Sequence, residues 1–443
     1  MFCRIPLDII AGLPCLDNPK SIVYNEIDLQ ARLPAGEGTR MNLQKLNRFL
    51  VHNPLVGRYF ERARIRYHCS LMTRARAKQG IAPKKVVFSS FRAGSYSDNP
   101  RAISEKLHEM YPAAEIVWLF NDPEAKRALV PDYVRIVNAD VETSLPELGT
   151  ARIWVDNFAK RYYLPLDKER QVYLNTWHGD RAFKKIGYDV KGPHEYRLEE
   201  DCHCMIAGSD FGARMMRSAF NFHGDLLVNG SPRNDRLVNY RQEEADAIRA
   251  KLGIDRETHL LLYAPTFRDT TAKEQAQPAT MDLKRTLQAL ERRTGGRWLC
   301  LFRAHYLALK GLDLSEVRDR MLDMTKYEDM TDLLMIADAL LTDYSSCAMD
   351  FCLLGRPIYL FQSDIEAYTT QDREMYFDMK DTPFFAARDQ AELERLIETV
   401  DAEAARENCR QICDYFGFHE TGHATEEVCK YLIAKLEGTK YEA

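Results

Sequence analysis

The sequence predicts an α/β protein built from two lobes, each a parallel sheet covered by helices. Three observations support this prediction. The chain has 443 residues, which suits two domains and an appendage. From residue 84 onward, short apolar runs alternate with helical stretches, as they do in parallel sheets. The turn-forming segment 230–234 divides these runs into two series, so we expect lobes at 84–230 and 231–443 with a cleft between them.

The expected strands are short and are followed by polar segments. They lie at 86–88, 116–120, 133–137, 151–155, 171–174, 203–207 and 225–229, and then at 260–263, 299–302, 339–341 and 358–361. Helices are expected at 100–111, 240–252, 281–293, 329–336 and 346–354. Ligands bind outside the carboxyl ends of strands in open α/β sheets, so the polar segments at these ends are the candidate sites.

Composition narrows the functional classes. A formal net charge of −5 argues against a nucleic-acid binder. Eleven cysteines without framework spacing favour a reducing, cytosolic setting. The first residues lack the apolar core of a signal peptide, and the sequence has no run of about 18 apolar residues. We therefore expect membrane contact, if any, only at the surface.

Residues 1–83 form an N-terminal extension with an unusual charge. Segment 40–80 holds ten Lys or Arg residues and a single acid, Glu61, with apolar residues at helical spacing. Such a basic amphipathic segment can lie on an anionic membrane. The alternative is a helix packed on the body with a solvated basic face.

The segment NTWHGD at 175–180 directly follows an expected strand. His178 at this point could act as a general base near neutral pH. Gly179 would let backbone N–H groups approach a phosphate, and Lys184 could neutralise phosphate charge. The alternative is a structural histidine bonded to the backbone.

Two polar segments follow strands of the second lobe. Arg303 and His305 are two residues apart on an extended chain, so both would point toward a bound diphosphate and its leaving group. Segment 342–346 (TDYSS) precedes an expected helix, with Ser345 or Ser346 as its N-cap. A helix start of this kind can bind phosphate.

Other motifs carry weaker signals. Segments 263–269, with Arg268, and 230–235 could enter the cleft or simply connect the lobes. The sequence 202–204 (CHC) has no second pair at zinc-ligand spacing, so we predict no metal site. Neither a P-loop nor a Gly-x-Gly-x-x-Gly motif is present.

Taken in order, these segments resemble the CDP-glycerol glycerophosphotransferases, the bacterial family of teichoic-acid primases and polymerases. The resemblance covers roughly residues 85–435. The matching segments are 88–91 with 96–100, 175–179 with 184–187, 231–235, 261–269, 303–305, 342–346 with Asp350, 356–361 and 376–378.

This resemblance implies a GT-B-like fold in which a polyol hydroxyl attacks the β-phosphorus of a CDP-polyol and CMP leaves. It gives His178 the role of base, and it assigns diphosphate binding to Arg303 and His305 and phosphate contacts to Ser345 and Ser346. Further substrate contacts are expected from Thr266, Arg268, Asp343, Gly179, Lys184, Arg233 and Asn234. No cofactor or metal is required, although a divalent cation stays open. The implied partners are a CDP-polyol donor, a polymer or lipid-linked acceptor and the inner face of the cell membrane.

The sequence departs from the family pattern in three places. Asp180 and Arg181 replace a Thr-Pro pair, Tyr306 replaces a proline, and Ser231 replaces a tyrosine. These changes leave the polyol and the acceptor open. The alternatives are a CDP-ribitol-dependent transferase, a nucleotide-sugar glycosyltransferase and a non-catalytic scaffold at the membrane.

Overall fold

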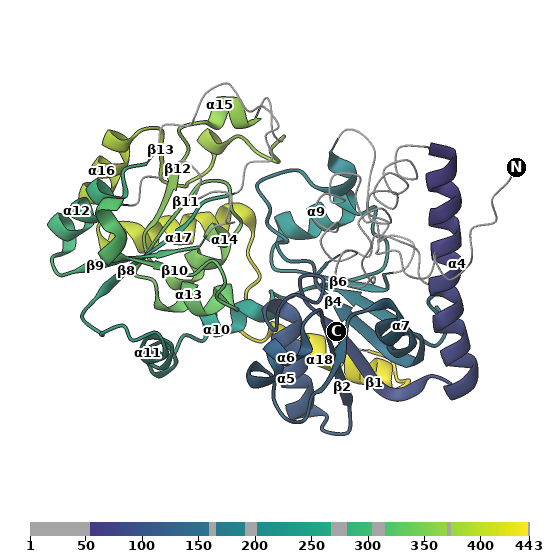
Figure 1. The fold of residues 1–443 in the computed structure, drawn as a ribbon. Helices are drawn as coiled ribbons and strands as arrows, with labels where there is room; N and C mark the ends of the chain where they lie inside the picture. Colours follow the sequence, from purple (N-terminus) through teal and green to yellow (C-terminus); the bar gives the residue numbers. More distant parts are fainter. Residues whose placement is uncertain are drawn as a thin grey trace, which may run out of the picture.

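In the computed structural model, the described residues are 54–158, 165–190, 202–266, 281–303, 315–369 and 374–441. They form two lobes, each with its own parallel sheet (Figure 1). The predicted α/β class with two parallel sheets is confirmed.

The first sheet has seven strands in the order β3-β2-β1-β4-β5-β6-β7. All neighbouring strands run parallel. The strand order reverses between β1 and β4, and the carboxyl ends at such a switch point form the usual ligand site. The strands are β1 (Ala82–Ser89), β2 (Glu115–Phe120), β3 (Arg135–Asn138), β4 (Ala151–Asp156), β5 (Val172–Asn175), β6 (Cys204–Ala207) and β7 (Asp225–Val228).

The second sheet has six parallel strands in the order β10-β9-β8-β11-β12-β13, with its switch point between β8 and β11. Strands β10 and β13 were not expected from the sequence, because runs of three and two residues are too short to show a pattern. The strands are β8 (His259–Ala264), β9 (Trp298–Phe302), β10 (Met321–Asp323), β11 (Ala339–Thr342), β12 (Ile358–Phe361) and β13 (Ala386–Ala387).

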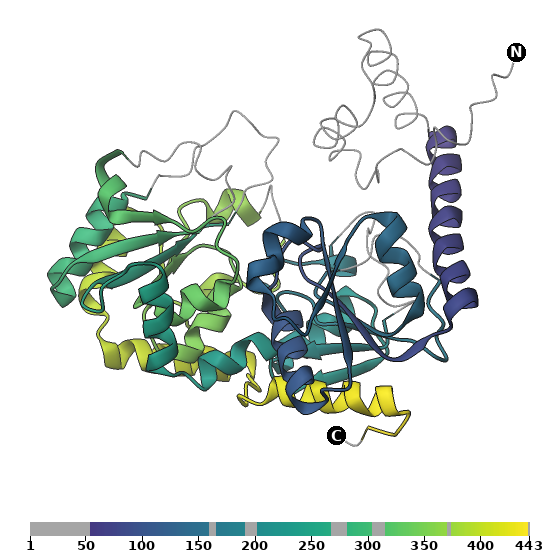
Figure 2. The ribbon, with the colours of Figure 1, turned by 60° about the horizontal axis from the view of Figure 1, so that its bottom comes forward.

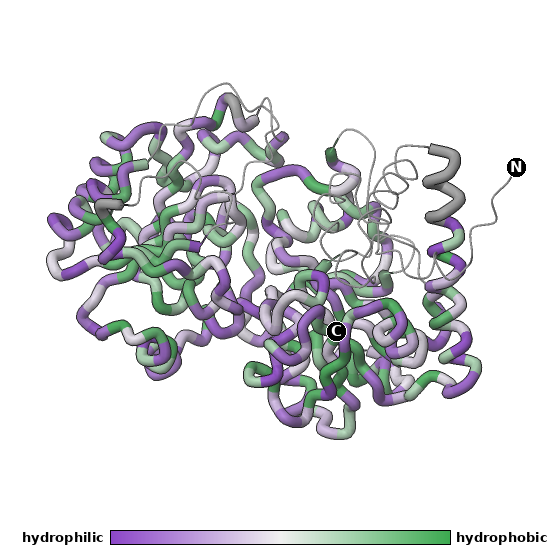
Figure 3. The backbone as a smooth tube through the Cα atoms, viewed as in Figure 1, coloured by the Kyte–Doolittle hydropathy of each residue, from purple (hydrophilic) through white to green (hydrophobic). Residues whose placement is uncertain are grey.

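Helices cover both faces of each sheet. In β1, Val86 and Phe88 point to the face covered by α5 and α18, whereas Val87 points to the face of α7 and α9. Figure 3 shows the hydrophobic residues concentrated in the two sheets. The principal helices of the lobes are α5 (Asp98–Met110), α7 (Val141–Thr150), α9 (Asp210–Ala219), α11 (Gln242–Lys251), α12 (Leu283–Thr294), α13 (Met330–Ile336), α14 (Cys347–Phe351), α16 (Gln390–Thr399), α17 (Ala402–Phe416) and α18 (Ala424–Glu437).

The chain crosses between the lobes twice. The first crossing contains the short 3-10 helix at Pro232–Asn234 and leads into α10 (Asp235–Val238). The second runs from α17 to α18, and α18 buries Val428 and Leu432 in the core of the first lobe. The lobes also meet at α6 (Pro123–Lys126), where Lys126 Nζ lies 2.7 Å from Glu328 Oε2.

Helix α4 (Pro54–Gln79) lies on the edge of the first lobe away from the second (Figure 2). Met72 is fully buried, and the Arg76 guanidinium donates to the Gly149 and Pro165 carbonyl oxygens over 3.1 and 2.7 Å. Four basic side chains stay exposed on this helix, namely Arg62, Arg66, Arg74 and Lys78. The basic segment is therefore packed on the body from residue 62 onward while keeping a solvated basic face, and residues 40–53 lie outside the described residues.

The contact between α4 and α7 depends on Gly149, so we expect Gly149→Val to destabilise the first lobe. A Cβ at position 149 would lie 2.7 Å from the Met72 carbonyl oxygen, a backbone atom held in α4. Overpacking of this kind costs about 1–3 kcal/mol of unfolding free energy. Urea unfolding measures the change. The control is Ala77→Val on the exposed face of α4, and equal unfolding free energies for the two variants would contradict the proposed packing.

Candidate active site at the lobe junction

The segment after β5 holds His178 in a defined position. Trp177 has a left-handed backbone with φ of 51°, which costs a non-glycine residue about 1–3 kcal/mol. Two hydrogen bonds of 2.8 Å stabilise this turn: the Trp177 N–H donates to Asn175 Oδ1, and the Thr176 N–H donates to the Asp156 carbonyl oxygen. The loop is thus fixed at the carboxyl ends of β4 and β5.

The His178 ring has one nitrogen engaged by the backbone. Its Nδ1 lies 2.8 Å from the Asn157 carbonyl oxygen, and because a carbonyl only accepts, Nδ1 carries the proton. The other nitrogen, Nε2, then keeps its lone pair. Burial lowers the pKa of the imidazole, partly opposed by the bond to Asn157. The ring is therefore neutral near pH 7, and Nε2 can accept a proton.

In the second lobe, two predicted substrate residues bind each other at the switch point. The Thr266 N–H donates to Asp343 Oδ1 over 2.9 Å, and its hydroxyl also donates to this carboxylate. Asp343 is buried. These bonds join the loops that follow β8 and β11, so Asp343 supports the site structurally, and its contact with substrate stays a prediction.

Helix α14 begins at Cys347, immediately after Ser345 and Ser346. Ser346 is the N-cap residue but makes no capping hydrogen bond with its side chain, while Ser345 Oγ accepts from the Cys347 N–H over 3.4 Å. Both serines are half-buried. The predicted helix start is present, and it follows the end of β11.

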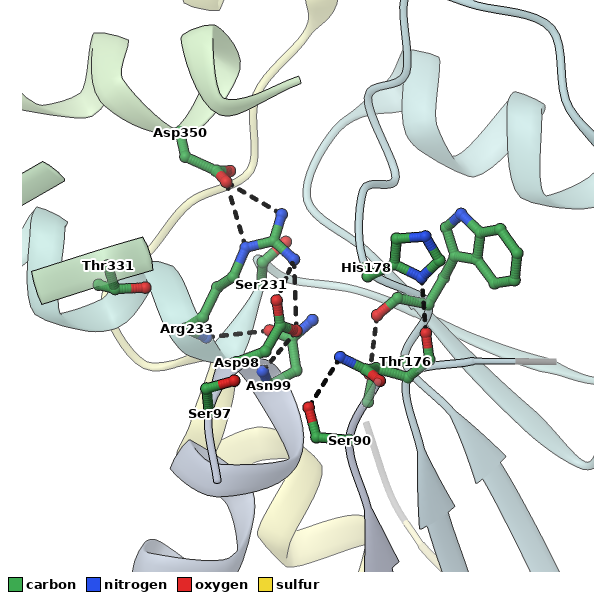
Figure 4. A network of polar contacts seen from close by, with 12 residues as sticks. Ser90, Ser97, Asp98, Asn99, Thr176, His178, Ser231, Arg233, Thr331 and Asp350 are labelled. Carbon is green, nitrogen blue, oxygen red and sulfur yellow. Dashed lines mark hydrogen bonds and ion pairs between the residues drawn. The ribbon is translucent and has the colours of Figure 1, made fainter. Parts of the chain in front are cut away.

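Gly179 and Ser346 bring the loops of the two lobes into contact. A Cβ on Gly179 would lie 3.0 Å from Ser346 Oγ, so a glycine leaves the room for this close approach. The candidate base, His178, is therefore the chain neighbour of the residue that contacts Ser346, one of the candidate phosphate ligands of the second lobe. Figure 4 shows His178 facing Arg233 and Asp98 at this junction.

A group of buried and half-buried charged and polar side chains, here called the junction cluster, lies beside this contact. Its members are Asp98, Asp180, Arg181, Arg233, Asn234, Asp350 and Glu420. The first three belong to the first lobe, and Asp350 lies on α14 of the second. Arg233 and Asn234 are on one chain crossing and Glu420 is on the other. Every connection between the lobes at this point therefore contributes to one cluster.

Two arginines hold the junction cluster together. Arg181 is 1% exposed, and its guanidinium lies 2.7 Å from Glu420 Oε1 and 3.1 Å from Asp350 Oδ1. Arg233 lies 3.0 Å from Asp350 Oδ2 and 3.3 Å from Asp98 Oδ2 (Figure 4). Asp350 thus bridges both arginines.

Electrostatics in the cluster follow from burial and pairing. Burial alone would lower the pKa of Arg181. The negative charges of three neighbours, Asp180, Glu420 and Asp350, outweigh the effect of burial and raise this pKa. Burial also raises the pKa of Glu420, against the effect of Arg181. Asp180 accepts from the Gly208 N–H over 2.6 Å and pairs with Arg181, so its charge is compensated inside the cluster.

Of the remaining predicted residues, Arg303 and Lys184 make other contacts, and two lie outside the described residues. Arg303 follows β9 and donates to the carbonyl oxygens of Met324 and Tyr327 over 3.1 and 2.6 Å. Lys184 Nζ lies 5.4 Å from the centre of the Tyr368 ring, which stacks on Tyr344 of the TDYSS segment. His305 and Arg268 lie outside the described residues.

Several residues of the site gave no functional signal in the sequence. Asp98 appeared only within a matched segment, and Arg181 appeared only as a departure from the family pattern, so neither was assigned a role. Glu420 and Asn157 gave no signal, because their roles arise from a chain crossing and from a backbone carbonyl. Among the described residues, no group of three or more His, Cys, Asp or Glu side chains could hold a metal ion.

Known proteins resemble this chain over most of its length. The family model for CDP-glycerol:poly(glycerophosphate) glycerophosphotransferase matches residues 71–434. A teichoic acid poly(glycerol phosphate) polymerase of Staphylococcus epidermidis is 32% identical over 322 residues, which cover 69% of this chain and 44% of that protein. A teichoic acid glycerol-phosphate transferase of Staphylococcus aureus is 29% identical over 369 residues, covering 79% and 92%.

Structural comparison agrees with the sequence comparisons. A solved structure of the wall teichoic acid polymerase TagF has a TM-score of 0.71 and 28% identity, covering 86% of this chain and 96% of that one. The two-lobed, GT-B-like arrangement is therefore confirmed. The chain spans about half the length of the first curated polymerases it matches, 44% in Staphylococcus epidermidis and 49% in Bacillus subtilis. On the match to residues 71–434, the chain belongs to the CDP-glycerol:poly(glycerophosphate) glycerophosphotransferase family.

Proposed function

We propose that this chain transfers glycerol phosphate from CDP-glycerol to a hydroxyl of a cell-envelope polymer or its lipid-linked precursor, and releases CMP. The observation that carries the proposal is the contact between Gly179 and Ser346. In this contact the loop that carries His178 in the first lobe meets the loop that carries Ser345 and Ser346 in the second, at the carboxyl ends of both sheets. Family membership supports the choice of a CDP-polyol as donor.

The proposed reaction follows from the state of His178. Its Nε2 takes the proton of the acceptor hydroxyl, and the hydroxyl oxygen bonds to the β-phosphorus of the donor. The bond from this phosphorus to the bridging oxygen breaks, and CMP leaves with that oxygen. Ser345, Ser346 and Arg303 are proposed to bind the donor phosphates, together with His305. The chain itself supplies the proton acceptor and the cationic groups, so the proposal needs no resident cofactor.

We expect His178→Ala to lower the rate of CMP release from CDP-glycerol by about 10²–10⁴-fold, because the variant loses its general base. The assay measures CMP with a polyol-phosphate acceptor present, and circular dichroism checks the fold. His108→Ala is the matched control, since His108 stacks on Tyr133 at the surface, away from the junction. A normal rate in His178→Ala would remove this residue from the mechanism.

The same assay separates the donor alternatives. A teichoic acid ribitol-phosphate primase of Bacillus spizizenii is 28% identical over 369 residues, so CDP-ribitol is the second candidate donor. If CMP is released from CDP-ribitol but not from CDP-glycerol, the transferred group is ribitol phosphate and not glycerol phosphate. Release of UDP or GDP from a nucleotide sugar, without CMP release, would overturn both.

We also propose that the protein works at the inner face of the cell membrane through the exposed basic side of α4. Arg62, Arg66, Arg74 and Lys78 are exposed there, while the opposite side of the helix packs on α7. None of the described helices has the length and apolarity needed to cross a bilayer. Basic side chains near an anionic surface contribute about 1 kcal/mol each.

Charge reversal on α4 tests this location. The variant changes four residues of α4 to Glu, namely Arg62, Arg66, Arg74 and Lys78. We expect it to bind phosphatidylglycerol vesicles at least about tenfold more weakly than the unchanged chain. This difference should vanish at high salt, which screens the charges. Vesicle co-sedimentation measures this. The control reverses four exposed arginines of the second lobe, Arg292, Arg293, Arg395 and Arg410, which gives the same net charge. Equal binding by the two variants would rule out α4 as the contact.

A further inference from the structure

The loop after β1, here called the acceptor loop (residues 90–94), has an unusual backbone. Phe91, Arg92 and Ala93 are consecutive non-glycine residues with φ of 45°, 57° and 64°. In this left-handed region the Cβ atom of a non-glycine residue crowds the following carbonyl oxygen, so each of the three residues is strained. Strain concentrated in three adjacent residues at the switch point of a sheet is typical of a functional segment.

Specific hydrogen bonds hold this strained loop in place. The Phe91 N–H donates to Asn157 Oδ1 over 2.7 Å, and Asn157 Nδ2 donates to Ser90 Oγ over 3.1 Å. Asn121 Nδ2 donates to the Arg92 carbonyl oxygen over 2.8 Å. Asn157 is also the residue whose carbonyl binds His178 Nδ1. The acceptor loop and the candidate base are therefore fixed by the same residue.

The side chains of the acceptor loop lie around the candidate base. The Phe91 ring is 40% exposed, and its centre lies 5.6 Å from that of His178. Phe158 stacks on His178 with ring centres 5.0 Å apart and an angle of 5°. The Arg92 guanidinium lies 4.4 Å from the centre of the Phe158 ring, and Arg92 is exposed. The Arg92 guanidinium and the His178 imidazole thus both contact the Phe158 ring, and all three residues belong to the first lobe.

We infer that Phe91 and Arg92 form a subsite for the acceptor, in which Arg92 binds the phosphodiester nearest the attacking hydroxyl. This inference rests on the proposed function. The hydroxyl must reach His178 Nε2, and in a polyol-phosphate chain the next phosphate is only a few bonds further along. Arginine suits such a phosphate because its planar guanidinium donates two parallel hydrogen bonds. Phe91 forms an apolar wall that keeps water from the His178 ring.

The first lobe is the appropriate place for an acceptor subsite. The proposed donor ligands, Ser345, Ser346 and Arg303, all belong to the second lobe. Arg92 lies on the same lobe as the base that activates the acceptor. The subsite would make the enzyme prefer acceptors that already carry phosphate, which distinguishes extension of a polyol-phosphate chain from transfer to a neutral alcohol.

The experiment compares Arg92→Gln with the unchanged chain, using CDP-glycerol and a synthetic glycerol-phosphate trimer as acceptor. We expect the KM for the trimer to rise about tenfold to a hundredfold, with kcat and the KM for CDP-glycerol nearly unchanged. Arg92→Lys keeps the charge without the planar fork, so we expect it to recover part of the loss. The matched control is Arg170→Gln. Arg170 is exposed and lies at the amino end of β5, whereas Arg92 follows the carboxyl end of β1.

Calorimetric titration of the trimer without donor separates failure of this inference from failure of the proposed function. Weaker trimer binding by Arg92→Gln, with Arg170→Gln unchanged, supports the subsite even if no donor yields CMP. Unchanged trimer affinity and unchanged KM in Arg92→Gln would overturn it. An equal loss in Arg92→Gln and Arg170→Gln would also overturn it, because the effect would then be one of net charge.

Discussion

The bridging of Arg181 and Arg233 by Asp350 is the interaction on which the geometry of the candidate site depends. Asp350 lies on α14, four residues after Ser346, and Arg181 lies three residues after His178. The bridge therefore connects the candidate base and the candidate phosphate ligands through three residues of chain on one side and four on the other. Removing one partner of a buried ion pair costs about 3–5 kcal/mol, since the other charge stays buried. Such a cluster stabilises one relative position of the lobes.

The topology of the two sheets explains why the candidate catalytic and binding residues lie at this junction. Each sheet has a switch point, between β1 and β4 in one lobe and between β8 and β11 in the other. Loops diverge at these points and leave their backbone groups available for a ligand. The acceptor loop follows β1 at the first switch point, and the His178 loop follows β5, the neighbour of β4. Thr266 and the TDYSS segment follow β8 and β11 at the second switch point. In the proposed function, the donor is bound by the second lobe and the acceptor by the first, an arrangement suited to transfer between two bulky substrates.

Sequence patterns predicted the fold more completely than the site. Strands such as β2 and β8 were found because five of their six residues are buried and apolar, a local property of the chain. His178, Ser345 and Ser346 were predicted as site residues because each lies in the polar segment that follows a strand. The partners of Arg181 could not be predicted, since Glu420 is far along the chain and meets it only through the second crossing. The strained backbone of residues 91–93 also gave no sequence signal, because none of the three is a glycine.

A double-mutant cycle on Arg181→Met and Asp350→Asn tests most directly whether the junction cluster positions the site. The unfolding free energy and the rate of CMP release are measured for the unchanged chain, both single variants and the double variant. We predict a coupling of about 0.5–3 kcal/mol in unfolding free energy and slower CMP release in each single variant, although His178 is intact. Additive unfolding free energies together with an unchanged rate of CMP release would contradict this account.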